Sequence, residues 1–125
     1  MIFYIDGETP AKKNSRIINT KTAKCFPSKR FSEWHRSASN IVHYQILRQP
    51  PKEKLPINQE VKISMTFVHG DLRRRDSDNG TSSILDLLTD CGVLADDNWK
   101  IVRELNVKND YEKGRPCCKV EIELL

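Results

Sequence analysis

The sequence predicts a small single α/β domain, with one mixed β-sheet and two main helices in the order βαβαββ. Residues 59–69 alternate apolar and polar side chains, which is the period of a half-buried strand. Residues 28–47 and 79–90 instead repeat apolar side chains at helical spacing, before and after that strand. The 125 residues suffice for one hydrophobic core, so we expect a single domain over 1–125.

A short first strand, residues 2–6, is followed by Gly7 and a long polar stretch. Within residues 7–28 the segments 15–20 and 24–26 are expected to pair as an irregular hairpin. A connection of this length in a compact domain is more often functional than idle. We therefore expect this stretch to contribute to a binding surface.

Ser28 is expected to cap the first helix, which extends to about residue 47. Glu33, in the early turns, favours the positive end of the helix dipole. The apolar stripe of this helix consists of Phe31, Trp34, Ala38, Ile41, Val42, Tyr44 and Ile46. Three prolines then stop the helix, namely Pro50, Pro51 and Pro56.

The strand at 59–69 leads directly into a charged loop. Asp78 is expected to cap the second helix, 79–90, and Gly92 suits the left-handed residue that follows its end. The buried face of this helix consists of Ile84, Leu85, Leu87 and Leu88. Residues 100–109 and 117–124 complete the sheet as two strands joined by a turn.

The composition, with 38% hydrophobic and 30% charged residues, describes a soluble globular protein. No apolar run approaches the length of a membrane span, so no membrane association is expected. The N-terminus lacks a basic segment followed by a long apolar one, so we expect no secretory signal and a cytoplasmic location. The four cysteines show no C-x-x-C spacing and are expected to be free thiols.

Positive charge is concentrated between residues 11 and 36, which contain eight lysines or arginines and one glutamate. The net charge of the whole chain is only +4, so this segment carries more than the overall surplus. Such a segment indicates a polyanionic partner, and the ordinary alternative is a solvated surface loop. We expect Lys12, Lys13 and Arg16 to contact nucleic-acid phosphates.

A second basic cluster, Arg73, Arg74 and Arg75, is followed at once by Asp76 and Asp78. Arginine matches two phosphate oxygens with its planar fork. In an extended backbone, carboxylates two residues apart lie on one side of the chain, where they can bind a divalent cation. This pattern indicates an enzyme that cleaves nucleic acid, and the alternative is a polar loop followed by a helix cap.

Asp96 and Asp97 are candidates for a third carboxylate ligand. Oxygen ligands of this kind suit Mg²⁺ or Mn²⁺ rather than zinc. The second helix carries the chain roughly 18 Å from Asp78, and five or six extended residues just span the return. Closure of the site within one chain and completion by a second subunit both remain open at this stage.

The order of these motifs resembles that of the RusA family of Holliday junction resolvases. The shared features are R-R-R-D-x-D-N at 73–79, a helix with D-x-L-T at its end, a glycine, and a closing D-D at 96–97. The spacing of the central match over 73–97 has no gap. A polar loop after the first strand and the helix after it match more loosely at 9–36.

The resemblance implies a homodimer that binds branched DNA, namely four-way junctions, and nicks opposing strands symmetrically with Mg²⁺ or Mn²⁺ during recombination and repair. It assigns the catalytic and metal-binding roles to Asp76, Asp78 and Asp97. The residues that it places beside the site are Asp96, Asp86, Ser82 and Asn79. It also implies a prophage-like origin.

One position departs from the family pattern, which has a functional lysine where this chain has Ser82. A hydroxyl supplies no cation to the phosphate, and Lys100 or Arg75 are the candidate substitutes. The alternative function is therefore a catalytically weak or inactive junction-binding protein. A further alternative is a regulatory nucleic-acid binder whose aspartates are only caps and loop residues.

Each of the two tryptophans is expected to have a packing role rather than to stack on bases. Trp34 belongs to the apolar stripe of the first helix. Trp99 follows Asp97 closely and is expected to pack the acidic loop against its neighbour, with an exposed ring available for base stacking as the alternative.

Overall fold

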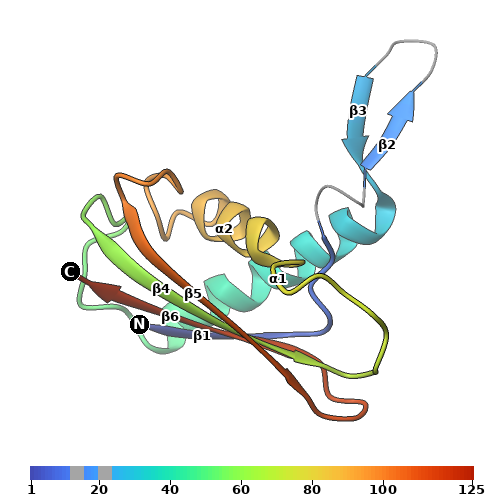
Figure 1. Cartoon of the computed structure of the whole chain (residues 1–125). Helices are drawn as coiled ribbons and strands as arrows, with labels where there is room; N and C mark the ends of the chain where they lie inside the picture. Colours follow the sequence, from blue (N-terminus) through green and yellow to red (C-terminus); the bar gives the residue numbers. More distant parts are fainter. Residues whose placement is uncertain (12–15, 20–23) are drawn as a thin grey trace.

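The computed structural model describes residues 1–11, 16–19 and 24–125, and of 16–19 and 24–27 only the backbone. It contains a four-stranded sheet covered on one face by two helices, and a separate hairpin that projects away from them (Figure 1). The elements are β1 Ile2–Asp6, β2 Arg16–Asn19, β3 Lys24–Pro27, α1 Lys29–Arg48, β4 Val61–His69, α2 Thr81–Asp90, β5 Val102–Tyr111 and β6 Cys117–Leu124. The predicted α/β class and two main helices are confirmed.

The sheet has the strand order β1-β6-β4-β5 and is mixed, as predicted. β6 pairs antiparallel with both β1 and β4, whereas β4 and β5 run parallel. Parallel neighbours need a crossover connection, and α2 provides it between β4 and β5. β2 and β3 pair with each other as a two-stranded hairpin, which confirms the irregular hairpin expected from the sequence.

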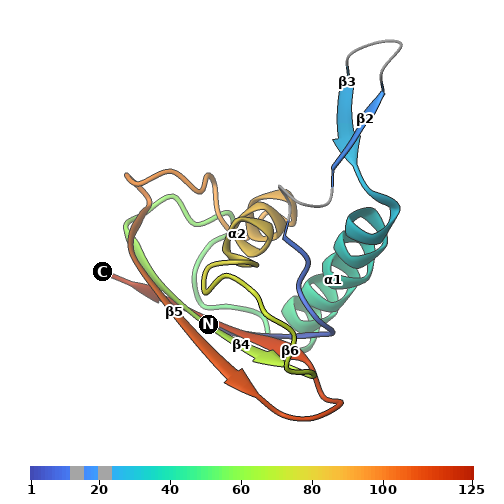
Figure 2. The ribbon, with the colours of Figure 1, turned by 45° about the vertical axis from the view of Figure 1, so that its right-hand side comes forward.

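The hydrophobic core lies between the sheet and the two helices (Figure 2). β4 is at its centre because Val61, Ile63 and Met65 are almost completely buried while the residues between them are not. α2 contributes Ile84, Leu87 and Leu88, all fully buried. Among the described residues, no helix is long and apolar enough to cross a membrane.

The first helix begins as its sequence predicts. Ser28 has extended backbone angles, and its Oγ accepts a hydrogen bond from the Phe31 backbone N–H at 3.2 Å. This contact satisfies one of the unpaired donors of the first turn.

The second helix does not begin as predicted, since Asp78 is not its cap. Gly80 holds the N-cap position, and no side chain caps the helix. The backbone carbonyl of Asp78, rather than its carboxylate, accepts the Thr81 N–H at 3.1 Å. Residues 77–80 form a turn between the motif and the helix, so the Asp78 carboxylate has no capping role.

The other expected features are present. Gly92 follows α2 with a positive φ of 74°, and Gly114 lies in the β5–β6 turn with φ 71°. Cys91, Cys117 and Cys118 are free thiols, as predicted. The prediction for Cys25 falls on a side chain outside those that the structure describes.

Candidate functional site

The arginine–aspartate loop, residues 71–79, connects the end of β4 to the turn before α2. The close packing of this loop against the core depends on Gly80, because a Cβ there would lie 2.7 Å from Phe67 Cε1 and 2.9 Å from Thr9 Cγ2. Those atoms belong to a buried ring and a buried threonine, which have little room to move. Glycine therefore allows the loop to pack directly against the end of the core.

The three arginines of the loop are not equivalent. The Arg75 side chain is only 14% exposed, and its Nε lies 2.6 Å from Glu8 Oε1. Its Nη2 contacts Asp71 Oδ1 at 2.9 Å, and its Nη1 donates to the Arg73 carbonyl at 3.1 Å. Arg75 thus holds the loop in shape, while the exposed Arg73 and Arg74 point their charge toward solvent.

A cavity of about 400 Å³ opens beside this loop. Positive charge on its wall comes from the loop and also from Arg30, in the first turn of α1. The other lining residues include Glu8, Asp76 and Asn79. Nothing in the sequence favoured Arg30 over the other basic residues of its segment. Its place in the wall of this cavity depends on how α1 packs in the fold.

The acidic pair lies beyond the other end of α2, in the connection to β5. A bridge between Ile57 and Leu94, with the Ala95 N–H donating to the Ile57 carbonyl at 2.9 Å, fixes the course of this connection. Asp96 Oδ1 accepts the Asp97 N–H at 2.7 Å, and its Oδ2 accepts the Asn98 amide at 3.0 Å. These hydrogen bonds lower the pKa of Asp96.

Asp97 has the opposite electrostatic environment. Partial burial raises its pKa, and the Asp96 carboxylate and the more distant charge of Asp86 raise it further. We call Asp86, Asp96 and Asp97 the acidic group, because the charges of Asp96 and Asp86 both raise the pKa of Asp97.

The predicted metal ligands do not all meet within one chain. In the part of the chain that the structure describes, no three His, Cys, Asp or Glu side chains are placed to hold a metal ion. The reason is topological, because α2 runs back between two parallel strands. Asp76 and Asp78 precede this ten-residue helix in the chain and Asp97 follows it, and a helix of this length spans roughly 15 Å.

The neighbouring residues differ in their exposure. Ser82 is exposed in the first turn of α2, one helical turn before Asp86. The adjacent Ser83 is fully buried, and its Oγ donates to the Pro10 carbonyl. Of the basic segment, Lys12 and Lys13 lie outside the described residues, and for Arg16 only the backbone in β2 is described.

The expectation for Trp99 was wrong, whereas that for Trp34 is confirmed. Trp34 packs against the core. Trp99 is 70% exposed, and the Arg103 guanidinium lies 5.8 Å from its ring centroid. The Trp99 ring therefore has a cation–π contact with Arg103, four residues later, without entering the core.

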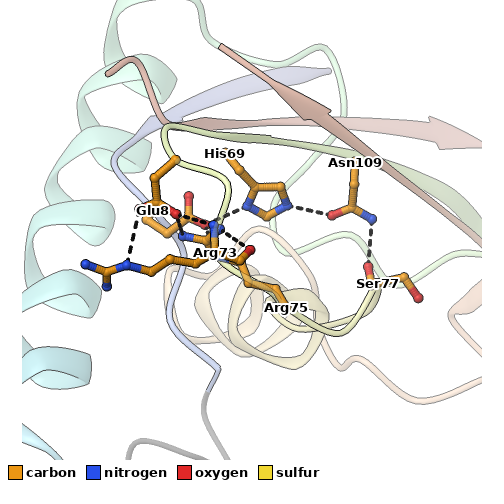
Figure 3. Close-up of polar contacts among 7 residues, drawn as sticks. Glu8, His69, Arg73, Arg75, Ser77 and Asn109 are labelled. Atoms are coloured by element: carbon orange, nitrogen blue, oxygen red, sulfur yellow. Dashed lines mark hydrogen bonds and ion pairs between the residues drawn. The ribbon is translucent and has the colours of Figure 1, made fainter. Parts of the chain in front are cut away.

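A polar network joins the arginine–aspartate loop to Glu8, His69 and Asn109, which had no sequence signal. Glu8 Oε1 contacts His69 Nδ1 as well as Arg75, each at 2.6 Å (Figure 3). His69 Nε2 lies 2.8 Å from Asn109 Oδ1, and Asn109 Nδ2 donates to the Ser77 carbonyl at 2.8 Å. The participants are separated by up to 101 positions of the chain, which no spacing pattern reveals.

The comparison with known proteins covers a range that includes both loops. The family model described as endodeoxyribonuclease RusA matches residues 6–124. The chain belongs to the RusA family. It is 29% identical over 109 residues to the crossover junction endodeoxyribonuclease RusA of Aquifex aeolicus (strain VF5), covering 87% of this chain and 80% of that protein. The resemblance inferred from the motif is thereby confirmed.

The raised pKa of Asp97 in this RusA-family chain predicts how the stability of the fold depends on pH. The pKa of Asp97 in the fold lies above its ordinary value, so stability present at low pH is lost as pH rises through that raised pKa. Asp97→Asn is expected to raise the melting temperature at pH 7 in a chelator, with no gain below pH 3. Thermal unfolding across this pH range measures the difference.

Asp71→Asn is the matched control, because hydrogen bonds from the Arg73 N–H and the Arg75 side chain lower the pKa of Asp71. The ionised Asp71 carboxylate of the wild-type protein stabilises the fold at neutral pH, and this stabilisation is lost on acidification. The Asp71→Asn variant should therefore have a lower melting temperature than the wild type at pH 7. A melting temperature for Asp97→Asn that falls with that of Asp71→Asn would contradict the described repulsion.

Proposed function

We propose that this protein is a metal-dependent, structure-selective endodeoxyribonuclease. It resolves four-way Holliday junctions by paired symmetric nicks, in DNA recombination and repair. The observation that carries the proposal is the RusA family match over 6–124, which includes both the arginine–aspartate loop and the acidic pair. The Aquifex relative is named for endonuclease action at crossover junctions.

The surface around the loop supports a DNA partner. Arg30, Arg73 and Arg74 contribute three guanidinium groups to one cavity wall. Asp76 on the same wall would repel phosphate, and these arginines offset that repulsion. The β2–β3 hairpin projects from the same side as the start of α1 (Figure 2), and Arg16 lies on it. We propose Lys12, Lys13 and Arg16 as further phosphate contacts on the basis of their charge; these side chains lie outside the described residues.

Asp76, Asp78 and Asp97 would hold the divalent cation, with Mg²⁺ as the expected ion and Mn²⁺ as a substitute. The donor set fits by its chemistry, since carboxylates are the usual ligands of these cations and the neighbouring carboxylates raise the pKa of Asp97. When bound, the cation supplies an activated water and stabilises charge on the leaving oxygen. The arginines hold the phosphate beside it.

The separation of the carboxylates favours a site shared between two subunits. Within one chain, α2 stands between Asp78 and Asp97 in the sequence. An antiparallel partner would bring the partner's Asp97 toward Asp78. β5 is the edge of the sheet on which such a partner can pair. Leu105 and Val107 are 41% and 36% exposed there, although their neighbours on β4, Ile63 and Met65, are buried.

The sequence of β5 is complementary to itself in one antiparallel register. Centred on Asn106, this register sets Glu104 opposite the partner's Lys108 and Leu105 opposite the partner's Val107. Each contact occurs twice, because a two-fold axis relates the two subunits and makes the interface isologous. The start of the partner's β5, and with it the partner's Asp97, then approaches the end of β5 that contacts the arginine–aspartate loop.

The first test is cleavage of a synthetic mobile four-way junction in a series of Mg²⁺ and Mn²⁺ concentrations. Asp76→Asn is expected to lower the rate by about 100-fold or more while retaining junction binding, because the arginines are intact. Asp90→Asn, which pairs with His35 away from the loop, is the matched control. Full activity of Asp76→Asn, or cleavage without a cation, contradicts the proposal.

The second test mixes two inactive variants, Asp76→Asn and Asp97→Asn. If each site combines Asp76 of one subunit with Asp97 of the other, a mixed dimer has one intact site and one with both substitutions. Random exchange should restore about a quarter of the wild-type sites and yield single rather than paired nicks. Val107→Glu, which breaks the β5 pairing, should prevent this recovery.

Subunit exchange is monitored with a different fluorescent label on each variant, and the oligomeric state is measured by analytical sedimentation. Recovery in the mixture supports the shared site. Verified exchange without recovery would mean that each chain completes its own site.

A third test concerns the alternative of a weak or inactive junction-binding protein, which Ser82 favours. Ser82→Lys introduces an exposed cation one turn before Asp86, beside the acidic group. Cleavage at saturating Mg²⁺ is expected to rise about tenfold, because a cation stabilises the phosphate transition state. Ser37→Lys, exposed on α1, controls for a general gain in charge. Equal rates for all three proteins would show that Ser82 is not limiting.

A further inference from the structure

The polar network of Figure 3 has a fixed direction of hydrogen bonding. The Ser77 carbonyl only accepts, so the Asn109 side chain turns its NH₂ toward Ser77 and its oxygen toward His69. Glu8 likewise presents a carboxylate oxygen to the other ring nitrogen. Both nitrogens of His69 therefore lie against side-chain oxygens, one from Glu8 and one from Asn109.

The ion pairs around Glu8 support this arrangement. Glu8 Oε1 contacts both the His69 imidazole and the Arg75 guanidinium, so one carboxylate oxygen joins the ring to the loop. Asp71, on the far side of Arg75, supplies a second negative charge at 2.9 Å from Nη2. The side chains of Glu8, His69 and Arg75 are all less than a fifth exposed, which strengthens their mutual attraction relative to surface ion pairs.

The network ends on the backbone between the two aspartates of the loop. Ser77 is flanked by Asp76 and Asp78, so its carbonyl direction sets the orientation of both neighbouring residues. Asn109 holds that carbonyl from β5, and Glu8 holds Arg75 from the segment after β1. His69, the last residue of β4, joins Glu8 to Asn109. Three strand ends thus converge on one stretch of loop.

We propose that Glu8, His69 and Asn109 are positioning residues that hold Asp76 and Asp78 ready for the cation. The inference rests on the proposed nuclease function and adds residues outside its arginine–aspartate motif. Groups that orient metal ligands typically change metal affinity or activity 10–100-fold when removed. The hydrophobic core does not include them, so their loss should alter the loop more than the stability of the fold.

Asn109→Asp tests the last link of the network. The substitution keeps the size of the side chain and an oxygen toward His69, but it replaces the donor to the Ser77 carbonyl with a repelling oxygen. The Mn²⁺ concentration for half-maximal junction cleavage is expected to rise about tenfold. Junction affinity in a chelator should remain at the wild-type value, because Arg73 and Arg74 are unchanged.

A readout independent of cleavage is amide hydrogen exchange of the peptide covering residues 71–79. Exchange there should accelerate in Asn109→Asp, while peptides from β4 and α2 keep wild-type protection. Asn109→Gln retains an amide donor and should recover part of both effects. Asn58→Asp, an exposed substitution before the opposite end of β4, is the matched control.

His69→Phe provides a second variant, which keeps a planar ring but donates no hydrogen bond. A raised Mn²⁺ requirement together with faster loop exchange, in either folded variant, supports the positioning role. Wild-type values for both measurements in both variants overturn it. If the wild-type protein cleaves no junction, the nuclease proposal fails, and the exchange data still decide whether the network holds the loop.

Discussion

The parallel pairing of β4 with β5 is the constraint on which the rest of the structure depends. Two parallel neighbours require a crossover, and α2 fills that role while burying Ile84, Leu87 and Leu88 against the sheet. The helix necessarily runs opposite to the strands. One charged loop therefore precedes it and the other follows it, at the two ends of the layer. The proposed metal ligands are therefore divided between these two loops because of the strand topology, and not because of the sequence of either loop.

Electrostatic roles are divided among residues that look alike in the sequence. Arg75 is enclosed by Glu8 and Asp71 and maintains the shape of the loop, whereas Arg74 is exposed beside it. Asp96 receives two hydrogen bonds that favour its charge. Asp97 has neighbours that disfavour its charge, which costs stability in the isolated chain. An unfavourable charge of this kind is typical of a site that awaits a ligand.

Much of the fold was predictable because local patterns and tertiary packing agree. The alternation along β4 and the Ser28 cap of α1 were identified correctly, since each depends on residues close in sequence. The expected Asp78 cap failed for the opposite reason. Gly80 must approach Phe67, and this long-range contact places the turn of residues 77–80 between the motif and the helix. Trp99 is exposed because its loop lies beyond the covered part of the sheet.

The sequence by itself determined the family, the α/β class and the arginine–aspartate motif, because these depend on residue types at short, regular spacings. Only the tertiary structure decided which of those side chains meet. Among the described residues it brought no three carboxylates together for a metal ion, and it joined Glu8, His69 and Asn109 around Ser77. The physical reason is that strand order and crossover direction set the distances between these side chains. Both arise from the burial of the whole core rather than from any local segment.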